Sequence, residues 1–465
     1  LKTVNSWQKK DKAVQFELTK EFIDQIREDL ELGKSTSTLV QVNELHPADI
    51  AEIFDNISAE EAKQLFHFLD KEKASDVLIE LEEDVREKFL FSWSPNEIAE
   101  TFIEQMDSDD AADMLQELPD RKKDEVISNI KDAEQASDIV DLLNYPEDSA
   151  GGLMAKELIK VNIDWSILKC VKEMRKQAED IENVYTIYVV DDRERLKGTL
   201  SLKRLLLAPS ESKVRDLYYE DVLSVKAYEK SEEVASMMEK YDLVVLPVVD
   251  ELDRLIGRIT IDDIVDVIKT EADKDYQMAS GISEKVDSAD SVGVLTRARL
   301  PWLLIGLLGG ILGALVIGQY EGQLQIYPEM ALFIPLIAAM GGNVGVQSSA
   351  IIVQGLANNS LGFDSLFARL GKEFLVAILN GLACSILILI YTLIFKDSID
   401  LALTVSMALV LVIIFAGLFG TFVPLMLDKY KIDPALATGP FITTMNDIVG
   451  LFIYFGIGHL MYNIF

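Results

Sequence analysis

The chain has 465 residues, of which 49% are hydrophobic, and its 77 Asp and Glu outnumber its 44 Lys and Arg to give a formal net charge of −33. A surface this acidic repels phosphate groups, which excludes nucleic acid as a partner. Two cysteines and three scattered histidines provide neither a disulfide framework nor a zinc site. Residues 1–299 hold 68 of the acidic residues and 39 of the basic ones. We therefore expect an acidic soluble part followed by a membrane domain.

The first 150 residues are predicted to be helical. Residues 1–35 hold one amphipathic helix, expected over residues 12–31 and closed by Gly33. Residues 36–150 repeat a short amphipathic pattern, with apolar residues at i, i+3 and i+4 and with Asp, Ser or Pro before several helices. Because repeats of one short helix stack on each other, the pattern predicts an all-α superhelical N domain.

Residues 151–262 contain two copies of one unit, offset by 59 residues. The segment YTIYVVDDRERLKGTLSLKRLLL, which begins at Tyr185, matches VVLPVVDELDRLIGRITIDDIVDVI, which begins at Val244. Each copy has the pattern strand, turn, strand, helix. The doubled unit resembles a pair of CBS domains, which implies an α/β fold for this part of the chain.

Pairs of CBS domains often bind adenine nucleotides through a Thr and an Asp that follow the last strand. Thr260 and Asp263 stand in these positions in the second copy, whereas the first copy has Ser201 and Arg204. The resemblance therefore makes ATP a candidate regulatory cofactor, bound once per pair. The alternative is a structural pair that binds no nucleotide.

Carboxylates gather in two segments of the soluble part. The first segment begins a predicted helix and contains Asp107, Asp109, Asp110 and Asp113. The second covers the start of a connecting helix and linker, expected over residues 263–299, and contains Asp262, Asp263, Asp266, Glu271, Asp273 and Asp275. Carboxylates four residues apart share a helix face, where like charges repel. These clusters are either solvated surface or sites where divalent cations relieve the repulsion.

Residues 300–465 contain five apolar segments that are long enough to cross a bilayer. They are Leu300–Ile317, Ala331–Leu356, Phe374–Phe395, Leu401–Leu427 and Ala437–Phe465. One side of the membrane receives Arg297, Arg299, Arg369, Lys372, Lys429 and Lys431, and the other receives Lys396. The positive-inside rule then predicts a multi-pass protein of the plasma (inner) membrane, with its N-terminus in the cytoplasm and its C-terminus outside.

Asp447 in the fifth span points most directly to function. It lies ten residues after Ala437, about 15 Å along the helix at 1.5 Å per residue, and an ionised carboxylate at the bilayer centre costs about 2.5–3.5 kcal/mol. Asp447 is either protonated and hydrogen-bonded inside the bundle, or part of an ion or proton site. Its neighbours Thr444 and Asn446 are hard oxygen donors, which suit Mg²⁺, Ca²⁺ or Mn²⁺. We also expect Gly439-Pro440 to interrupt the helix and leave carbonyl groups unpaired.

The second span contains a polar run, GGNVGVQSS, over residues 341–349. Polar residues at membrane depth must face protein or water. The run is therefore either a surface for close helix packing, or a pore lining or helix break that faces the segment around Asp447.

The order of these parts resembles the MgtE family of bacterial magnesium channels. The most specific matches are GGNVGVQSS and DPALATGPFITTMNDIVG, residues 433–450. The resemblance implies a homodimer with a pore between the second and fifth spans. It places the selectivity carboxylate at Asp447, and it implies that four further residues help to hold hydrated Mg²⁺, namely Gly439, Thr443, Gly341 and Asn343.

The resemblance also implies regulatory Mg²⁺ ligands in the acidic soluble part. The matching positions are Asp109, Asp113, Glu232, Asp242, Asp263, Asp266, Glu271 and Asp275. Lys230 and Lys274 stand where acidic residues would be expected.

We therefore predict a multidomain Mg²⁺-selective uptake channel, gated shut by cytoplasmic Mg²⁺ bound to the acidic domains, with divalent cations, membrane lipid and a second copy of the chain as partners. The alternative is an ion-coupled carrier that exchanges Mg²⁺ for Na⁺ or H⁺. A membrane-anchored receptor without transport is a third reading, although the polar fifth span argues against it. The sequence has no nucleophile–base pair, phosphate-binding loop or catalytic metal motif, so we do not expect an enzyme.

Overall fold

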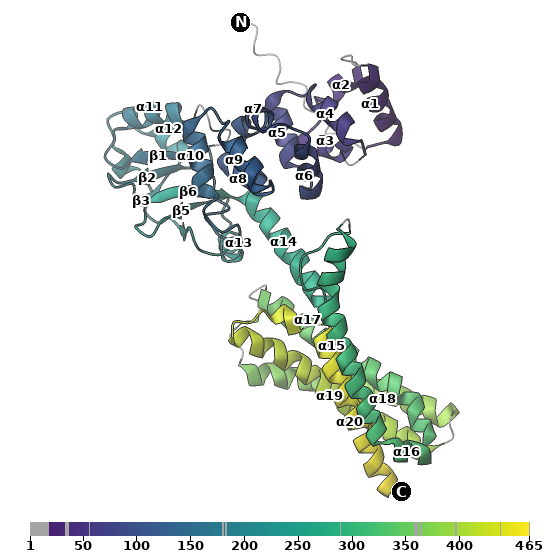
Figure 1. The fold of residues 1–465 in the computed structure, drawn as a ribbon. Helices are drawn as coiled ribbons and strands as arrows, with labels where there is room; N and C mark the ends of the chain where they lie inside the picture. Colours follow the sequence, from purple (N-terminus) through teal and green to yellow (C-terminus); the bar gives the residue numbers. More distant parts are fainter. Residues whose placement is uncertain are drawn as a thin grey trace. The chain divides into compact units, whose positions relative to one another are not determined.

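The computed structural model describes residues 18–32, 37–54, 56–178, 181, 184–288, 290–357, 361–362, 365–395, 398–437 and 439–464. Two compact units divide the chain, Leu1–Ile268 and Lys269–Phe465. The first unit contains a helical domain and two small sheets, and the second is a bundle of long helices (Figure 1).

The helical domain consists of ten short helices and one 3-10 turn among its described residues. They are α1 (Lys20–Leu32), α2 (Ser37–Val42), α3 (Pro47–Phe54), α4 (Ala59–Phe66), α5 (Lys71–Ile79), α6 (Glu83–Phe91), α7 (Pro95–Thr101), η1 (Ile103–Gln105), α8 (Ser108–Gln116), α9 (Asp120–Ile127) and α10 (Ala133–Leu142). The helix expected over residues 12–31 corresponds to α1, while residues 12–17 and Gly33 lie outside the described residues. The prediction of a stack of short helices is confirmed.

Basic side chains cap the C-terminal ends of several helices in the stack. Arg27, Lys63 and Lys71 each donate to the carbonyl oxygen of the residue 29 positions later, at 2.6, 2.9 and 3.3 Å. Cations suit the C-terminal carbonyl groups of a helix, which carry partial negative charge. In the core of the domain, Phe54 and Phe102 pack edge to face against Phe66, and the Phe89 ring is tilted by 31° to it.

The CBS pair contains two three-stranded sheets of the same topology. The first copy comprises β1 (Ile159–Asn162), α11 (Ile167–Gln177), β2 (Ile187–Val190), β3 (Leu196–Leu200), α12 (Leu202–Leu207) and η2 (Val214–Asp216). The second comprises β4 (Val225–Lys226), α13 (Ser231–Lys240), β5 (Val245–Val249), β6 (Leu255–Thr260) and α14 (Ile261–Ala279). In each sheet the first two strands are parallel and the last two are antiparallel. The sequence pattern predicted two strands per copy and missed the first strand of each sheet, β1 and β4, which lie before the repeated segments that were compared.

The two copies share even their turn geometry. Glu194 and Asp253, which are 59 positions apart, both have a positive φ, of 60° and 61°. These turns meet, because Leu196 N–H donates to the Asp253 carbonyl and Leu255 N–H donates to the Glu194 carbonyl, both at 3.0 Å. The internal repeat inferred from the sequence is therefore a structural repeat.

The second unit contains five helices that are long and apolar enough to cross a membrane. They are α15 (Val292–Gln319), α17 (Ile334–Ala357, which follows η3, Pro328–Phe333), α18 (Leu366–Phe395), α19 (Ile399–Lys429) and α20 (Pro440–Ile464). Two shorter elements join them, α16 (Glu321–Ile326) and η4 (Pro434–Ala437). Both α15 and α18 begin eight residues earlier than expected, because charged residues in the first two to three turns precede each apolar stretch.

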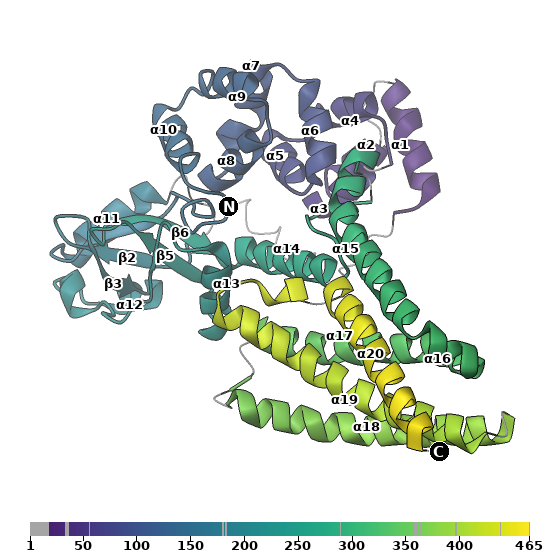
Figure 2. The ribbon, with the colours of Figure 1, turned by 60° about the horizontal axis from the view of Figure 1, so that its bottom comes forward.

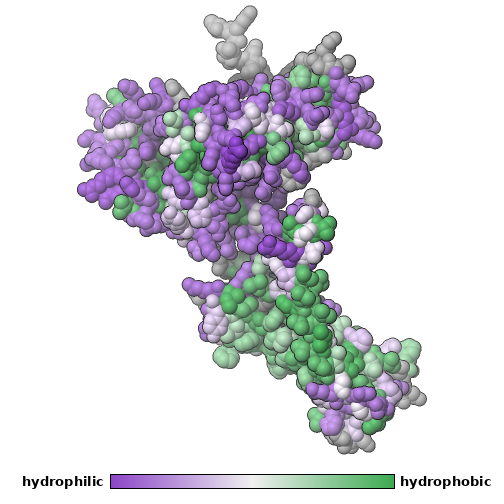
Figure 3. Space-filling view, in the orientation of Figure 1, coloured by the Kyte–Doolittle hydropathy of each residue, from purple (hydrophilic) through white to green (hydrophobic). Residues whose placement is uncertain are grey.

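Helix α19 is the centre of this bundle and packs against α17, α18 and α20 (Figure 2). A side chain added at Gly420 would overlap the carbonyl oxygen of Gly345, so α17 and α19 approach closely there. On the outside, apolar residues cover the exposed surface of α15 and its neighbours, whereas the surface of the first unit is mainly hydrophilic (Figure 3). An apolar outer face and a small-residue interior are what a bilayer requires.

Two expectations about helix breaks are wrong. Helix α17 runs without interruption through residues 341–349, because its glycines pack against other helices instead of unwinding. Gly439-Pro440 does not interrupt α20 but begins it. Pro440 is the first helical residue, where the missing N–H costs nothing, and Gly439 takes a φ of +56° that favours glycine.

The close approach of α17 and α19 yields a stability prediction. We expect Gly420→Ala to lower the thermal midpoint of the full-length protein in detergent, because overpacking costs about 1–3 kcal/mol. Gly310→Ala is the matched control, since no atom lies within 4 Å of the added carbon. A Gly420→Ala protein that unfolds at the same temperature as the control would contradict the close approach.

Candidate cation pathway and acidic cation centre

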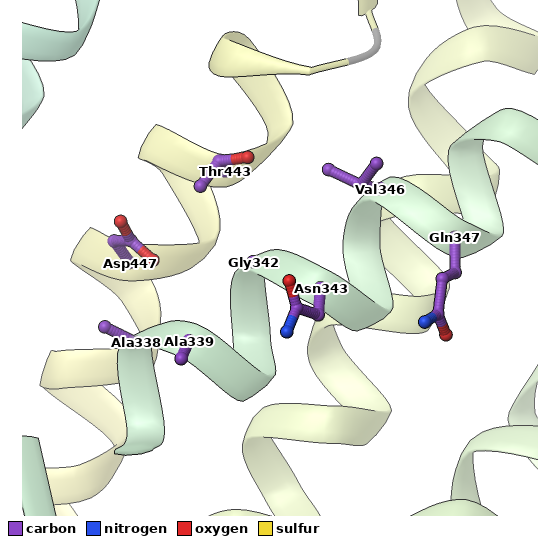
Figure 4. Close-up of a pocket in the computed structure, with 8 residues that line it drawn as sticks. All are labelled: Ala338, Ala339, Gly342, Asn343, Val346, Gln347, Thr443 and Asp447. Carbon is purple, nitrogen blue, oxygen red and sulfur yellow. The ribbon is translucent and has the colours of Figure 1, made fainter. Parts of the chain in front are cut away.

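A hollow of about 410 Å³ lies between α17 and α20. It is lined by Ala338, Ala339, Gly342, Asn343, Val346, Gln347, Thr443 and Asp447 (Figure 4). Three predicted pore residues, Asn343, Thr443 and Asp447, thus meet in one place. Gln347 was not predicted; it lies one turn after Asn343 in the polar run, and that spacing is the signal that could have identified it.

Asp447 is the carboxylate of this hollow. It is the eighth residue of α20, about 10 Å along the helix from Pro440 rather than 15 Å, because the helix begins three residues later than expected. Its Oδ1 is buried and has no hydrogen-bond partner among the described residues. A side-chain carbon at Gly342 would lie 3.7 Å from that oxygen. The absence of a side chain at Gly342 therefore leaves the carboxylate open to the hollow.

Thr443 and Gly439 are linked to each other at the start of α20. The Gly439 carbonyl accepts hydrogen bonds from Thr443 N–H at 3.1 Å and from the Thr443 hydroxyl at 2.9 Å. The expectation of unpaired carbonyl groups is therefore wrong for Gly439. The hydroxyl oxygen of Thr443 keeps its lone pairs and lies in the lining of the hollow.

Gly341 and Asn446 belong to the helix contact behind the hollow. Asn446 is 1% exposed, and its Nδ2 donates to the Gly341 carbonyl at 3.3 Å. A side chain at Gly345 would overlap the same nitrogen. Asn446 therefore locks the rotation of α20 against α17, one residue before Asp447, and is not one of the oxygen donors of the hollow as its position in the sequence suggested.

A second cluster, in the soluble unit, brings carboxylates together from segments far apart in the sequence. Asp107, Asp109 and Glu157 each offer an oxygen within 4.8 Å of the others. Glu157 is held by Ser108, whose N–H and hydroxyl donate to its two oxygens at 3.1 and 2.8 Å. The guanidinium of Arg258 forms an ion pair with Asp107, with 3.5 Å between Nη2 and Oδ2. We call Asp107, Asp109, Asp110, Glu157 and Asp263 the acidic centre.

The carboxylates of the acidic centre repel one another. Burial, followed by the charges of Asp110, Asp263 and further neighbours, raises the pKa of Asp109 well above its usual range. Burial, followed by the charges of Asp263, Asp107 and further neighbours, raises the pKa of Asp110 to about 7. The pKa of Asp263 is raised as well, mainly by burial. A cation held among these oxygens would remove the repulsion, so the donor set fits a hard divalent cation.

The other predicted regulatory residues have varied surroundings. Asp113 lies one turn after Asp109 in α8; its side chain is exposed, but desolvation and the charge of Asp263 raise its pKa also. Glu232 lies in the first turn of α13, and Asp242 follows α13 with a φ of 52°. Helix α14 carries Asp266, Glu271 and Asp275, of which Glu271 forms an ion pair with Lys274 at 3.0 Å.

The predicted nucleotide residues pair with each other. The Thr260 hydroxyl donates to Asp263 Oδ2 at 2.7 Å, and the Thr260 N–H points to the same oxygen at 3.3 Å, which caps α14. A narrow pocket lies at another place in the CBS pair, and its lining includes Tyr185, Tyr188 and Arg258. Sequence reasoning missed these residues because they come from both copies of the repeat.

Three family models match the chain. The matches are to divalent cation transporters over residues 334–457, to the MgtE intracellular N domain over residues 45–148, and to the CBS domain over residues 150–211 and 214–270. The spanning bundle, its hollow and the acidic soluble unit therefore define a multi-pass divalent cation transporter with CBS domains.

Comparison with known relatives narrows this class to the magnesium transporters. The magnesium transporter MgtE of Bacillus subtilis is 33% identical over 429 residues, which is 91% of this chain and 94% of the relative. That of Thermus thermophilus is 33% identical over 443 residues, which is 94% of this chain and 97% of the relative. A crystal structure of the cytosolic domain of the Mg²⁺ channel MgtE in complex with ATP is 33% identical, covers 53% of this chain and 99% of its own, and has a TM-score of 0.49. The chain belongs to the MgtE family of magnesium transporters, a non-enzymatic family.

The raised pKa values of the acidic centre give a pH dependence. Because the pKa of Asp110 is about 7 in the folded protein against 3.8 ordinarily, the stability contributed by its protonated form is complete below pH 3.8 and is lost as the pH rises through 7. In EDTA we expect the thermal midpoint of the full chain, followed by tryptophan fluorescence, to fall from about pH 5 to about pH 8. Mg²⁺ should restore it at the higher pH.

Asp110→Asn should reduce that fall, whereas Asp120→Asn, at an exposed position of α9, should leave it unchanged. A midpoint in EDTA that rises with pH would contradict the repulsion in the acidic centre.

Proposed function

We propose that this magnesium transporter is a Mg²⁺-selective uptake channel whose ions pass along the hollow between α17 and α20. The observation that supports this most is the buried Oδ1 of Asp447, which has no hydrogen-bond partner among the described residues and lies beside the hollow. A carboxylate in that state has lost water without gaining a protein partner, which is costly. A cation in the hollow offsets the cost.

The lining suits a hydrated ion better than a dehydrated one. Mg²⁺ gives up its waters reluctantly and binds through one or two carboxylates, whereas Ca²⁺ takes six to eight direct oxygen ligands. Asp447 is the single carboxylate in the lining. Six waters occupy roughly 180 Å³ at about 30 Å³ each, which fits within the 410 Å³ of the hollow. Asn343, Gln347 and Thr443 then hold the waters by hydrogen bonds.

The open side of the hollow supports a homodimer. Asn343 and Gln347 are exposed in the single chain although they lie in a spanning helix. Amide groups facing lipid are costly, whereas a water-filled pore shared with a second copy satisfies them. We therefore propose that two copies enclose the pathway, each contributing one Asp447.

The orientation and location follow from charge. Arg369 and Lys372 lie in the first two turns of α18, and Lys429 ends α19. Under the positive-inside rule these charges support a cytoplasmic position for these helix ends and for the acidic unit, and an outside position for the C-terminus of α20. Lys396, the basic residue assigned to the other side, lies outside the described residues. The protein thus belongs to the plasma (inner) membrane, with lipid around its apolar outer face.

We propose that cytoplasmic Mg²⁺ closes the channel by binding in the acidic centre, and that α14 transmits the change to the spanning helices. Cytoplasmic Mg²⁺ neutralises the carboxylates and favours the compact, closed state; without it, repulsion loosens the soluble domains. Helix α14 continues from the last CBS strand to Ala279, whose carbonyl lies 2.5 Å from where a side chain at Gly439 would be. Movement of α14 would therefore act on the start of α20, eight residues before Asp447.

The pore assignment predicts the effect of one substitution. Asp447→Asn should abolish Mg²⁺ uptake into cells or proteoliposomes while the folded yield stays normal, since the amide cannot balance a cation's charge. Asp428→Asn, at an exposed position near the end of α19, is the control and should transport normally.

Normal uptake by Asp447→Asn would exclude the proposed pathway. Patch recording separates the two transport modes: unitary Mg²⁺ currents that need no gradient of Na⁺ or H⁺ indicate a channel. Uptake that requires such a gradient, with no unitary current, would indicate the coupled carrier instead.

The gating assignment predicts a shift in sensitivity. Replacing Asp109 and Asp113 together by Asn should raise the cytoplasmic Mg²⁺ concentration that closes the channel by about tenfold, for a loss of about 1.4 kcal/mol of binding. The control replaces Asp120 and Asp124, two exposed carboxylates with the same spacing in α9. Unchanged closure in the first double variant would reduce the acidic centre to a structural feature.

ATP is proposed as a second regulator, bound in the pocket between the CBS copies. The Arg258 guanidinium lies 5.4 Å from the centre of the Tyr185 ring, which offers a stacking face and a positive charge. The pocket holds only about 10 Å³, so it must open for a nucleotide. Tyr185→Ala should weaken ATP binding measured by calorimetry, and Thr260→Val should not. The opposite result would restore the site at Thr260 and Asp263.

A further inference from the structure

A second carboxylate, Glu373, lies within a spanning helix and meets α17 on the side away from the hollow. It is the eighth residue of α18, about 10 Å along that helix. Its Oε1 accepts a hydrogen bond from the hydroxyl of Ser348 at 2.7 Å, and Ser348 is 5% exposed. Sequence analysis missed Glu373 because the expected span began one residue later, at Phe374.

The surroundings of Glu373 show that packing alone does not require a carboxylate. The buried face of α18 continues with Ala377, Gly381 and Ser385 at four-residue spacing. Gly381 approaches Val410 of α19 closely, and small residues of this kind are enough to join two spanning helices. This packing does not call for a carboxylate, so the presence of Glu373 in the same row needs another explanation.

Helix α19 leaves room for the carboxylate. A side-chain carbon at Gly417 would lie only 2.9 Å from Glu373 Oε1. The oxygen that binds Ser348 therefore sits where α17, α18 and α19 converge. The hydrogen bond from Ser348 ties α17 to α18 at this point.

The position of Ser348 on α17 connects this contact to the hollow. Successive residues of an α-helix differ by 100° around the axis. Gln347 precedes Ser348 and lines the hollow, as does Asn343 one turn earlier (Figure 4). Holding Ser348 towards Glu373 therefore fixes the rotation at which Asn343 and Gln347 line the hollow.

We propose that Glu373 is a positioning residue for cation selection, which acts through Ser348 on the lining of the hollow. The inference rests on the proposed pathway along that hollow. The important atom is the acceptor oxygen. Glu373 Oε1 accepts the hydrogen bond from the Ser348 hydroxyl, and Ser348 in turn holds the amide groups of α17 at the distance that suits a hydrated Mg²⁺. Loss of the acceptor lets α17 rotate, which changes which ions pass.

The test compares full-length variants in proteoliposomes, measuring the uptake of Mg²⁺, Mn²⁺ and Co²⁺ per folded protein. Glu373→Gln keeps an acceptor oxygen and should retain both rate and ion preference. Glu373→Leu and Ser348→Ala should each reduce Mg²⁺ preference over Mn²⁺ and Co²⁺ by about tenfold, the value of a hydrogen bond to a charged group. The double variant should lose no more than either single variant, because both remove one contact.

Ser385→Ala is the matched control, since Ser385 lies in the same row of α18 and donates to the Ser406 carbonyl at 2.9 Å, away from the lining. It should lower the thermal midpoint without changing ion preference. Unchanged ion preference in Glu373→Leu, or in Ser348→Ala if Glu373→Leu does not fold, would overturn the inference, as would equal losses in Glu373→Gln and Glu373→Leu. Asp447→Asn measured in parallel separates the two proposals: if it also transports normally, the pathway itself is wrong.

Discussion

The second unit depends on one constraint, which is a carboxylate inside a bundle of spanning helices. One oxygen of this carboxylate has no hydrogen-bond partner in the part of the chain that the structure describes. Asp447 is costly there, and the neighbouring structure maintains it. Asn446 locks α20 against α17 at Gly345, and Gly342 places no side chain beside the buried oxygen of Asp447. Helix α17 stays continuous through these glycines, which pack against side chains of α19 and α20. The polar run of α17, residues 341–349, therefore both packs against other helices and lines the hollow in which we propose that the ion binds.

The soluble unit also holds carboxylates in buried surroundings, in the acidic centre. In the acidic centre, Glu157 from the start of the CBS pair is held by Ser108 at the start of α8. Asp109 and Asp263 repel each other across these segments. We propose that the acidic centre, like the hollow beside Asp447, holds a divalent cation. The proposed feedback follows: the ion that crosses at Asp447 also stabilises the compact form of the unit joined to the bundle through α14.

Much of this organisation could be predicted from the sequence because it rests on periodic signals. Apolar length identified the five spans, and the 59-residue offset identified a repeat that extends to the matching turns at Glu194 and Asp253. Asn343, Thr443 and Asp447 were expected in one site and lie in one hollow. Glu157 and Tyr185 could not be found in this way, because tertiary contact alone brings them to their partners. The role of Asn446 depends on the rotation of α20, which Gly345 decides, and Glu373 was hidden by the charged first turns of its helix.

The most direct test of the account is a crystal structure of the full-length protein grown with Mn²⁺, with anomalous scattering used to locate the metal. Mn²⁺ is a hard cation that prefers oxygen ligands, as Mg²⁺ does. The account predicts anomalous density in the hollow beside Asp447, bridged by waters to Asn343 and Thr443, with further density in the acidic centre. Density in the acidic centre with none in the hollow, in wild-type protein that transports Mg²⁺, would contradict the claim that ions pass at Asp447.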